Sequence, residues 1–162
     1  MGFIKKKFLV LTSLALVVGT FAVGGIKNTS EVEAAESTYE HIFVKKGITF
    51  GENTLSGKKW NFAMEESTYI DFDSTKGIQL GSKKNPADSI SLTSVESFTN
   101  ISSITINTSG ANDIKANLSV KVGDATVGST VSLTTTATPY TFENINLSGN
   151  VSFNWDVTQR AV

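Results

Sequence analysis

Strict alternation of apolar and polar residues is the feature that most constrains the fold of this chain. Residues 116–122 read Ala-Asn-Leu-Ser-Val-Lys-Val, and residues 151–157 read Val-Ser-Phe-Asn-Trp-Asp-Val. A period of two sends one row of side chains into a core and the other row into water, as in a half-buried strand. We therefore predict an antiparallel strand at each of these segments.

The rest of the chain after residue 48 has the composition of strands and turns. Val, Ile, Thr, Ser and Phe dominate, and turn residues such as Gly123-Asp124 and Ser148-Gly149-Asn150 separate the apolar runs. Residues 48–50 are predicted as a short strand and residues 51–53 as a turn. Short strands without a helical period predict an all-β fold, a two-sheet antiparallel β-sandwich.

The N-terminus carries the marks of an export signal. Lys5, Lys6 and Lys7 form a basic cluster, and residues 8–26 hold no charge. Val32-Glu33-Ala34 supplies the small residues of a cleavage site, so residues 1–34 are predicted to be a helical signal peptide cut after Ala34. The apolar stretch is also long enough to remain as an uncleaved anchor.

Cleavage after Ala34 would leave one small domain with a negative net charge. Removing residues 1–34 leaves 128 residues, with four of the 14 basic and two of the 15 acidic side chains removed, and a net charge of −3. We expect residues 35–47 to be a tail with a first strand in residues 39–44, and residues 48–162 to be the β-sandwich domain. The negative net charge disfavours a nucleic-acid partner. We expect the protein to contact the membrane only through the signal peptide, before cleavage.

The absence of cysteine excludes thiol chemistry and bears on where the protein is located. The chain contains no cysteine, so it has neither thiolate metal sites nor a cysteine nucleophile. A domain that is exported without disulfides must be held together by its core. We expect a bacterial protein that is secreted or extracellular, with retention at the cell surface left open.

Asp71 and Asp73 are the candidate metal ligands. They are two residues apart in an expected strand, so they share one face. Such a pair could contribute to a Ca²⁺ site, which needs further oxygen ligands, or could act as an acid and a base. The plainer interpretation is two exposed acids on a strand. We expect no cofactor other than this candidate Ca²⁺.

Trp60 and Tyr69 are the candidate ligand-binding residues. An outward aromatic ring on a sandwich can stack on a sugar, although Trp60 shares its row with Phe62 and Met64, which favours a core position. His41, the only histidine, lies near the expected mature N-terminus without an evident nucleophile beside it. We interpret His41 as a surface or structural residue, and no catalytic residue is assigned.

Three segments carry a resemblance to a known kind of module. They are residues 75–87 followed by SISLTS, residues 104–111 followed by LSVKVG, and residues 133–142, LTTTATPYTF. Together they resemble a jelly-roll-like β-sandwich accessory module of exported bacterial proteins, over residues 48–162. The resemblance implies fold and export, and it transfers no functional residue.

The resemblance also implies that a strand is missing. In modules of this look, the segment like residues 151–162 is followed by a further strand that closes the sheet, whereas this sequence stops at Val162. We therefore expect a C-terminally truncated domain that lacks about one strand. A neighbour left unpaired would be an exposed edge that invites association.

Three functional hypotheses remain open. The first is a non-catalytic exported module that binds carbohydrate or cell-envelope partners. The second is a structural surface protein, or a remnant of a larger exported protein, without a ligand of its own. The third is a glycan hydrolase that depends on carboxylates such as Asp71 or Asp73, which would need a deep cleft that so small a sandwich rarely builds.

Overall fold

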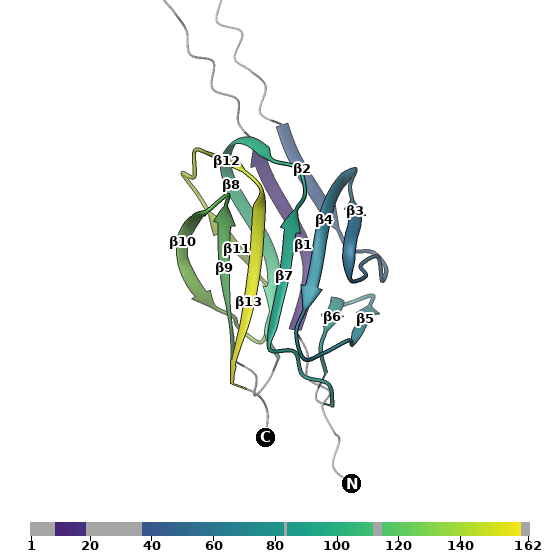
Figure 1. Cartoon of the computed structure of the whole chain (residues 1–162). Helices are drawn as coiled ribbons and strands as arrows, with labels where there is room; N and C mark the ends of the chain where they lie inside the picture. Colours follow the sequence, from purple (N-terminus) through teal and green to yellow (C-terminus); the bar gives the residue numbers. More distant parts are fainter. Residues whose placement is uncertain (1–8, 19–36, 83, 112–114, 160–162) are drawn as a thin grey trace, which may run out of the picture.

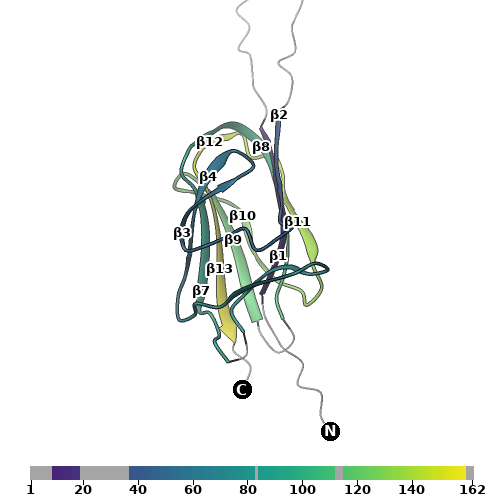
Figure 2. The ribbon, with the colours of Figure 1, turned by 90° about the vertical axis from the view of Figure 1, so that its right-hand side faces the viewer.

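The computed structural model describes residues 9–18, 37–82, 84–111 and 115–159. Thirteen strands make up the secondary structure of these residues, and they form two antiparallel sheets. Figure 2 shows the sheets from the side as two layers. The predicted all-β antiparallel fold is confirmed. The predicted cut after Ala34 and the lysine cluster lie outside the described residues.

One sheet, which we call sheet B, is built from residues 51–159. Its strand order is β10-β9-β13-β7-β4-β3. The strands are β3 (Gly51–Leu55), β4 (Lys58–Met64), β7 (Ser89–Ser94), β9 (Lys115–Val122), β10 (Ala125–Ser132) and β13 (Val151–Gln159). The two strictly alternating segments therefore become β9 and β13, which pair with each other along most of their length (Figure 1).

The other sheet, sheet A, has the order β11-β8-β1-β6-β5, with β12 beside β8 and β2 beside β1. Its strands are β1 (Leu9–Val18), β2 (Ser37–Ile42), β5 (Ile70–Asp73), β6 (Gly77–Leu80), β8 (Phe98–Ser109), β11 (Thr138–Phe142) and β12 (Leu147–Gly149). Strand β1, purple in Figure 1, lies inside this sheet.

Strand β1 corrects the helix predicted for the export signal. Leu9–Val18 forms ten residues of strand, paired with β8 on one edge and with β6 and β2 on the other. The physical reason is that a short uncharged run of Leu, Val, Thr and Ala fits a buried strand as well as a helix, and periodicity cannot separate the two. The structure thus assigns these ten residues to a strand, and their role in export stays a prediction.

Two further expectations change. The turn expected at residues 51–53 is the first half of β3, and the strand expected at residues 48–50 is a loop, in which the Asn53 side chain bonds to Thr49 and Gly51. Strand β13 has partners on both edges, β7 and β9, so no exposed edge lies beside it. The edge strands of sheet B are β10 and β3.

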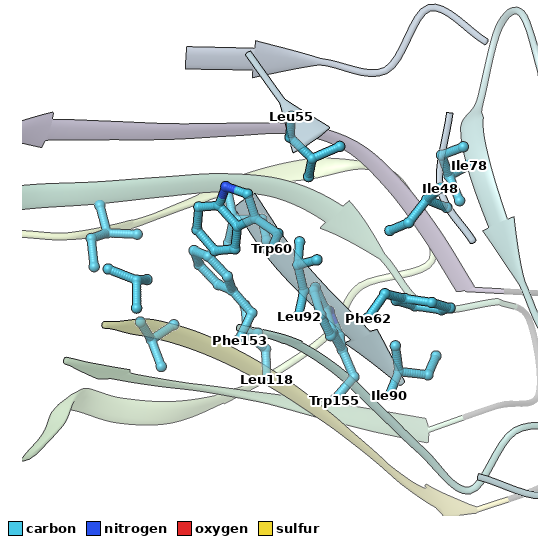
Figure 3. Packing of buried hydrophobic residues seen from close by; sticks show 14 of the residues in the cluster. Ile48, Leu55, Trp60, Phe62, Ile78, Ile90, Leu92, Leu118, Phe153 and Trp155 are labelled. Carbon is cyan, nitrogen blue, oxygen red and sulfur yellow. The ribbon is translucent and has the colours of Figure 1, made fainter. Parts of the chain in front are cut away.

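The core lies between the two sheets and is rich in aromatic rings. Trp60, Phe153 and Trp155 are all fully buried, and their rings follow one another with centroids about 6 Å apart. Figure 3 shows these rings together with Leu92 and Leu118. Each comes from a strand of sheet B, where every second residue points inward. Sheet A contributes the opposing wall, including the fully buried Ile101, Ile104, Ile106 and Ile78.

Candidate functional site: the polar face of sheet B

Asp73 has a structural role in the turn between β5 and β6. Its Oδ1 accepts hydrogen bonds from the Thr75 backbone N–H at 2.8 Å, the Thr75 hydroxyl at 2.6 Å and the Lys76 N–H at 3.0 Å. These bonds to Thr75 and Lys76 favour the charged carboxylate and lower the pKa of Asp73. A short acidic side chain that bonds to the backbone two residues later is a common turn device.

Asp71 lies on the same edge strand and contacts Tyr69. The Tyr69 hydroxyl donates to Asp71 Oδ2 at 3.1 Å, and the Phe72 N–H donates to Asp71 Oδ1 at 2.9 Å. Partial burial, with the adjacent Asp71 carboxylate, raises the pKa of Tyr69. Among the residues that the structure describes, no group of three acidic or histidine side chains converges as a metal site. Tyr69 and Asp71 therefore form a small exposed pair.

Trp60 is a core residue, which corrects its assignment as a ligand-binding residue. Its side chain is 0% exposed and its indole Nε1–H donates to the Tyr39 hydroxyl at 2.9 Å. The ring lies against Tyr39, Phe98 and Phe153. Trp60 is buried because position 60 faces inward on β4, in the same row as Phe62, so no ring face is available to a sugar.

His41 pairs with Ser56 across the end of β2. The His41 Nδ1 and the Ser56 Oγ are 3.0 Å apart, and burial lowers the pKa of His41. Ser56 occupies the two-residue turn between β3 and β4, where its φ is 44°. No carboxylate hydrogen-bonds to His41 in the described part of the chain, so the third group that orients a catalytic histidine is absent there.

The outer surface of sheet B carries a cluster of neutral hydrogen-bonding side chains. We call the following residues the polar face: Asn61, Ser91, Thr93, Asn117, Ser119, Ser152 and Asn154. They come from the four adjacent strands β4, β7, β13 and β9. All alternate with buried neighbours such as Phe62, Leu92 and Phe153, so they point away from the core.

Strand register arranges the polar face in rows. One row runs from Ser91 across Asn154 to Ser119, and the next runs from Asn61 across Thr93 to Ser152. Within the second row the hydroxyls of Thr93 and Ser152 are 2.9 Å apart. Neighbouring strands are about 4.8 Å apart, so the three residues of each row span two spacings, or about 9.6 Å. The face thus offers hydroxyl and amide groups at regular spacing.

The sequence reasoning missed this face, although a signal was present. The polar positions of the alternating strands were counted only as solvated positions. The signal is the recurrence of Ser, Thr and Asn at seven outward positions of four strands, beside the charged Lys59, Lys121 and Asp156. Only the strand order, which is non-local, reveals that these positions are contiguous.

Comparisons with known proteins leave the family open. No protein-family model, no curated protein and no solved structure matches this chain. Within the described ranges, the structure has no helix of the length and apolar character needed to span a bilayer. The chain is an all-β antiparallel domain, and its function must be argued from its own residues.

Proposed function

We propose that this protein is an exported, non-catalytic β-sandwich module that binds carbohydrate or another hydroxyl-rich component of the bacterial cell envelope through the polar face of sheet B. The observation that carries the proposal is the clustering of Ser, Thr and Asn side chains on the adjacent strands β4, β7, β13 and β9. Hydroxyl and amide groups both donate and accept, as recognition of sugar hydroxyls requires.

The charge of the molecule is consistent with a neutral ligand. The chain from residue 35 has a net charge of −3, which disfavours polyanions such as nucleic acids. No acidic or basic side chain belongs to the polar face, although Lys59, Lys121 and Asp156 lie on the same outer side of the sheet. Neutral hydrogen bonds therefore dominate the centre of the surface.

Export is the second part of the proposal. The lysine cluster, the uncharged stretch and the Val-x-Ala site support a removable signal peptide and a secreted or surface location. The resemblance to jelly-roll-like accessory modules points the same way. The retained-anchor alternative would keep the domain at the membrane.

The two other functional readings have less support. Asp73 keeps its carboxylate in a turn with a lowered pKa, and a general acid needs the opposite shift. A purely structural surface protein needs no ligand, and it is the reading to which the polar face should be compared experimentally.

The proposal is tested by glycan-array and cell-wall binding of the protein recovered after export. We expect Asn154→Ala to reduce binding at least about tenfold, because a binding surface loses hydrogen bonds that water does not replace equally. Tyr69→Ala tests the alternative pair on β5, and the exposed turn variant Asp124→Ala is the matched control. Equal melting temperatures establish that all three variants are folded.

The outcomes separate the readings. Loss of binding in Asn154→Ala alone supports the polar face, and loss in Tyr69→Ala alone moves the site to β5. Absence of binding to every glycan and to the cell wall contradicts the proposal and favours the structural reading. Glycan turnover that disappears in Asp71→Asn would instead revive the hydrolase.

A further inference from the structure

Strand β1 completes sheet A. It pairs with β8 from Val10 opposite Ser109 to Val18 opposite Ile101. Its other edge pairs with β6 through Leu9–Leu11 and with β2 through Ser13–Val18. Among the described strands, β8 and β6 do not pair with each other. Sheet A is therefore continuous only because β1 lies between them, as the purple strand of Figure 1 shows.

The register gives the chemistry of this position. Leu14 and Leu16 lie opposite Ile106 and Ile104, whose side chains are fully buried. Ala15 lies opposite Thr105, whose hydroxyl contacts Thr141 on the outer side of the sheet at 3.0 Å. A strand in this position needs apolar residues at the inward register positions and small residues at the outward ones. It also needs no charge along about ten residues.

Export removes this strand. Residues 9–18 are the centre of the apolar stretch of the proposed signal peptide, so they leave with it when the chain is cut after Ala34. The remaining gap between β8 and β6 is about two strand spacings, or about 9.5 Å. Strands β8 and β6 would then each present an edge without its β1 partner. Such an edge is a template for an incoming strand.

We propose that the exported domain receives, in the position vacated by β1, an extended strand of about ten uncharged residues from another exported protein, running antiparallel to β8. This inference rests on the export part of the proposed function. A foreign strand is favoured over a second copy because every described strand from β3 to β13 is already paired within its own sheet, and because β2, with only six residues including the charged Glu40, does not supply ten uncharged residues. Among the described strands, β2 pairs with β1 alone, and it loses this pairing when the signal leaves.

The first experiment traps β1 in the unprocessed full chain. The protein has no cysteine, so an Ala15→Cys, Thr105→Cys pair is the only thiol pair present. Antiparallel partners are within disulfide distance, and we expect an intramolecular disulfide. The matched control is Ala15→Cys with Thr93→Cys, because Thr93 lies in β7 of sheet B. Equal trapping in both would overturn the placement of β1 and the inference with it.

The second experiment supplies the strand to the exported protein. The probe is a synthetic peptide of residues 9–18 with Ala15→Cys and two lysines added at each end for solubility. We expect it to form a disulfide with the exported Thr105→Cys protein and not with the Thr93→Cys protein, and to raise the melting temperature by several degrees. A peptide with Leu14→Pro should do neither, because proline cannot pair on both edges.

Each remaining outcome decides the matter. If the exported protein is unfolded and folds when the peptide is added, the inference is supported. If it is a stable monomer that ignores the peptide, β2 or another segment has closed the gap and the inference is wrong. A disulfide that joins two copies of the Thr105→Cys protein would contradict the foreign strand and place a second copy there instead. If mass spectrometry shows that residues 9–18 are retained after secretion, the proposed cleavage fails even though the first disulfide forms.

Discussion

Sheets A and B have similar sizes, but their strands come from different parts of the chain. All six strands of sheet B come from residues 51–159, and they carry Trp60, Phe153 and Trp155 into the core. Sheet A depends at its centre on residues 9–18, which also have the character of an export signal. The difference teaches that sheet B is complete within residues 51–159, whereas sheet A would lose its central strand if the proposed signal peptide is removed.

Breaking β1 should produce the largest effect. Leu14 is opposite both His41 on β2 and Ile106 on β8, so Leu14→Pro removes a ladder N–H and distorts a strand that is paired on both edges. We expect the unprocessed full chain to lose more than about 3 kcal/mol of unfolding free energy in urea denaturation. Leu14→Ile is the control, because isoleucine favours strands. Equal stability of the two variants would mean that β1 is not a central strand.

Core truncations should separate the two sheets. Phe153→Ala in sheet B is expected to cost about 3–5 kcal/mol in both the full chain and the exported protein. Ile106→Ala in sheet A should cost about 2–5 kcal/mol in the full chain and clearly less in the exported protein, where β8 would have lost its pairing with β1. Urea denaturation of the four proteins measures this. Equal costs of Ile106→Ala in both forms would show that sheet A does not depend on β1.

Tyr39 joins β2 to sheet B and gives the next largest effect. Its hydroxyl donates to the Leu55 carbonyl and accepts from Trp60 Nε1–H. Tyr39→Phe leaves both groups without this partner and should cost about 1–3 kcal/mol.

The ionisation of Tyr39 gives the same contact a pH signature. Burial raises the pKa of Tyr39 from 10.0 to about 12. The folded state therefore favours the neutral phenol, and this contribution is complete below pH 10 and lost as the pH rises through about 12. Chemical denaturation between pH 9 and about 12 should show a loss of unfolding free energy in the wild type that Tyr39→Phe does not show. Parallel curves would contradict the assigned contact.

The two buried tryptophans allow a finer comparison. Both are 0% exposed, but only Trp60 has a partner for its N–H, since Trp155 Nε1 has none among the residues that the structure describes. Both changes to Phe remove similar volume. Trp60→Phe should therefore cost about 1 kcal/mol more than Trp155→Phe. A reversed order in thermal or urea denaturation would argue against the Trp60–Tyr39 bond.

The smallest effect is expected at His41. Burial lowers its pKa below the ordinary 6.5, so the folded state favours the neutral ring. The stabilising contribution is present above pH 6.5 and is lost as the pH falls through the lowered value. In urea denaturation, the unfolding free energy of the wild type should therefore fall on acidification by more than that of His41→Gln. If the difference in unfolding free energy between the wild type and His41→Gln is the same at pH 7.5 and at about pH 5, this prediction is wrong.

The sequence predicts much of sheet B because its information is local. Alternation at residues 116–122 and 151–157 gives β9 and β13 directly, and their inward rows are the buried ones. Position 60 was ambiguous because an inward and an outward aromatic have the same local pattern. The polar face could not be assembled from sequence, since it depends on β4, β7, β13 and β9 being neighbours. Strand β1 was missed because an uncharged run serves a signal peptide and a central strand equally well.

Amide hydrogen exchange of β8 tests the dependence of sheet A on β1 most directly. In the unprocessed full chain, we expect the amides of residues 101–109 that face β1 to be as protected as those of β13, because both strands are paired on two edges. In the exported protein without an added strand, protection of those β8 amides should fall while that of β13 persists. Equal protection of β8 in both forms would contradict the central role of residues 9–18.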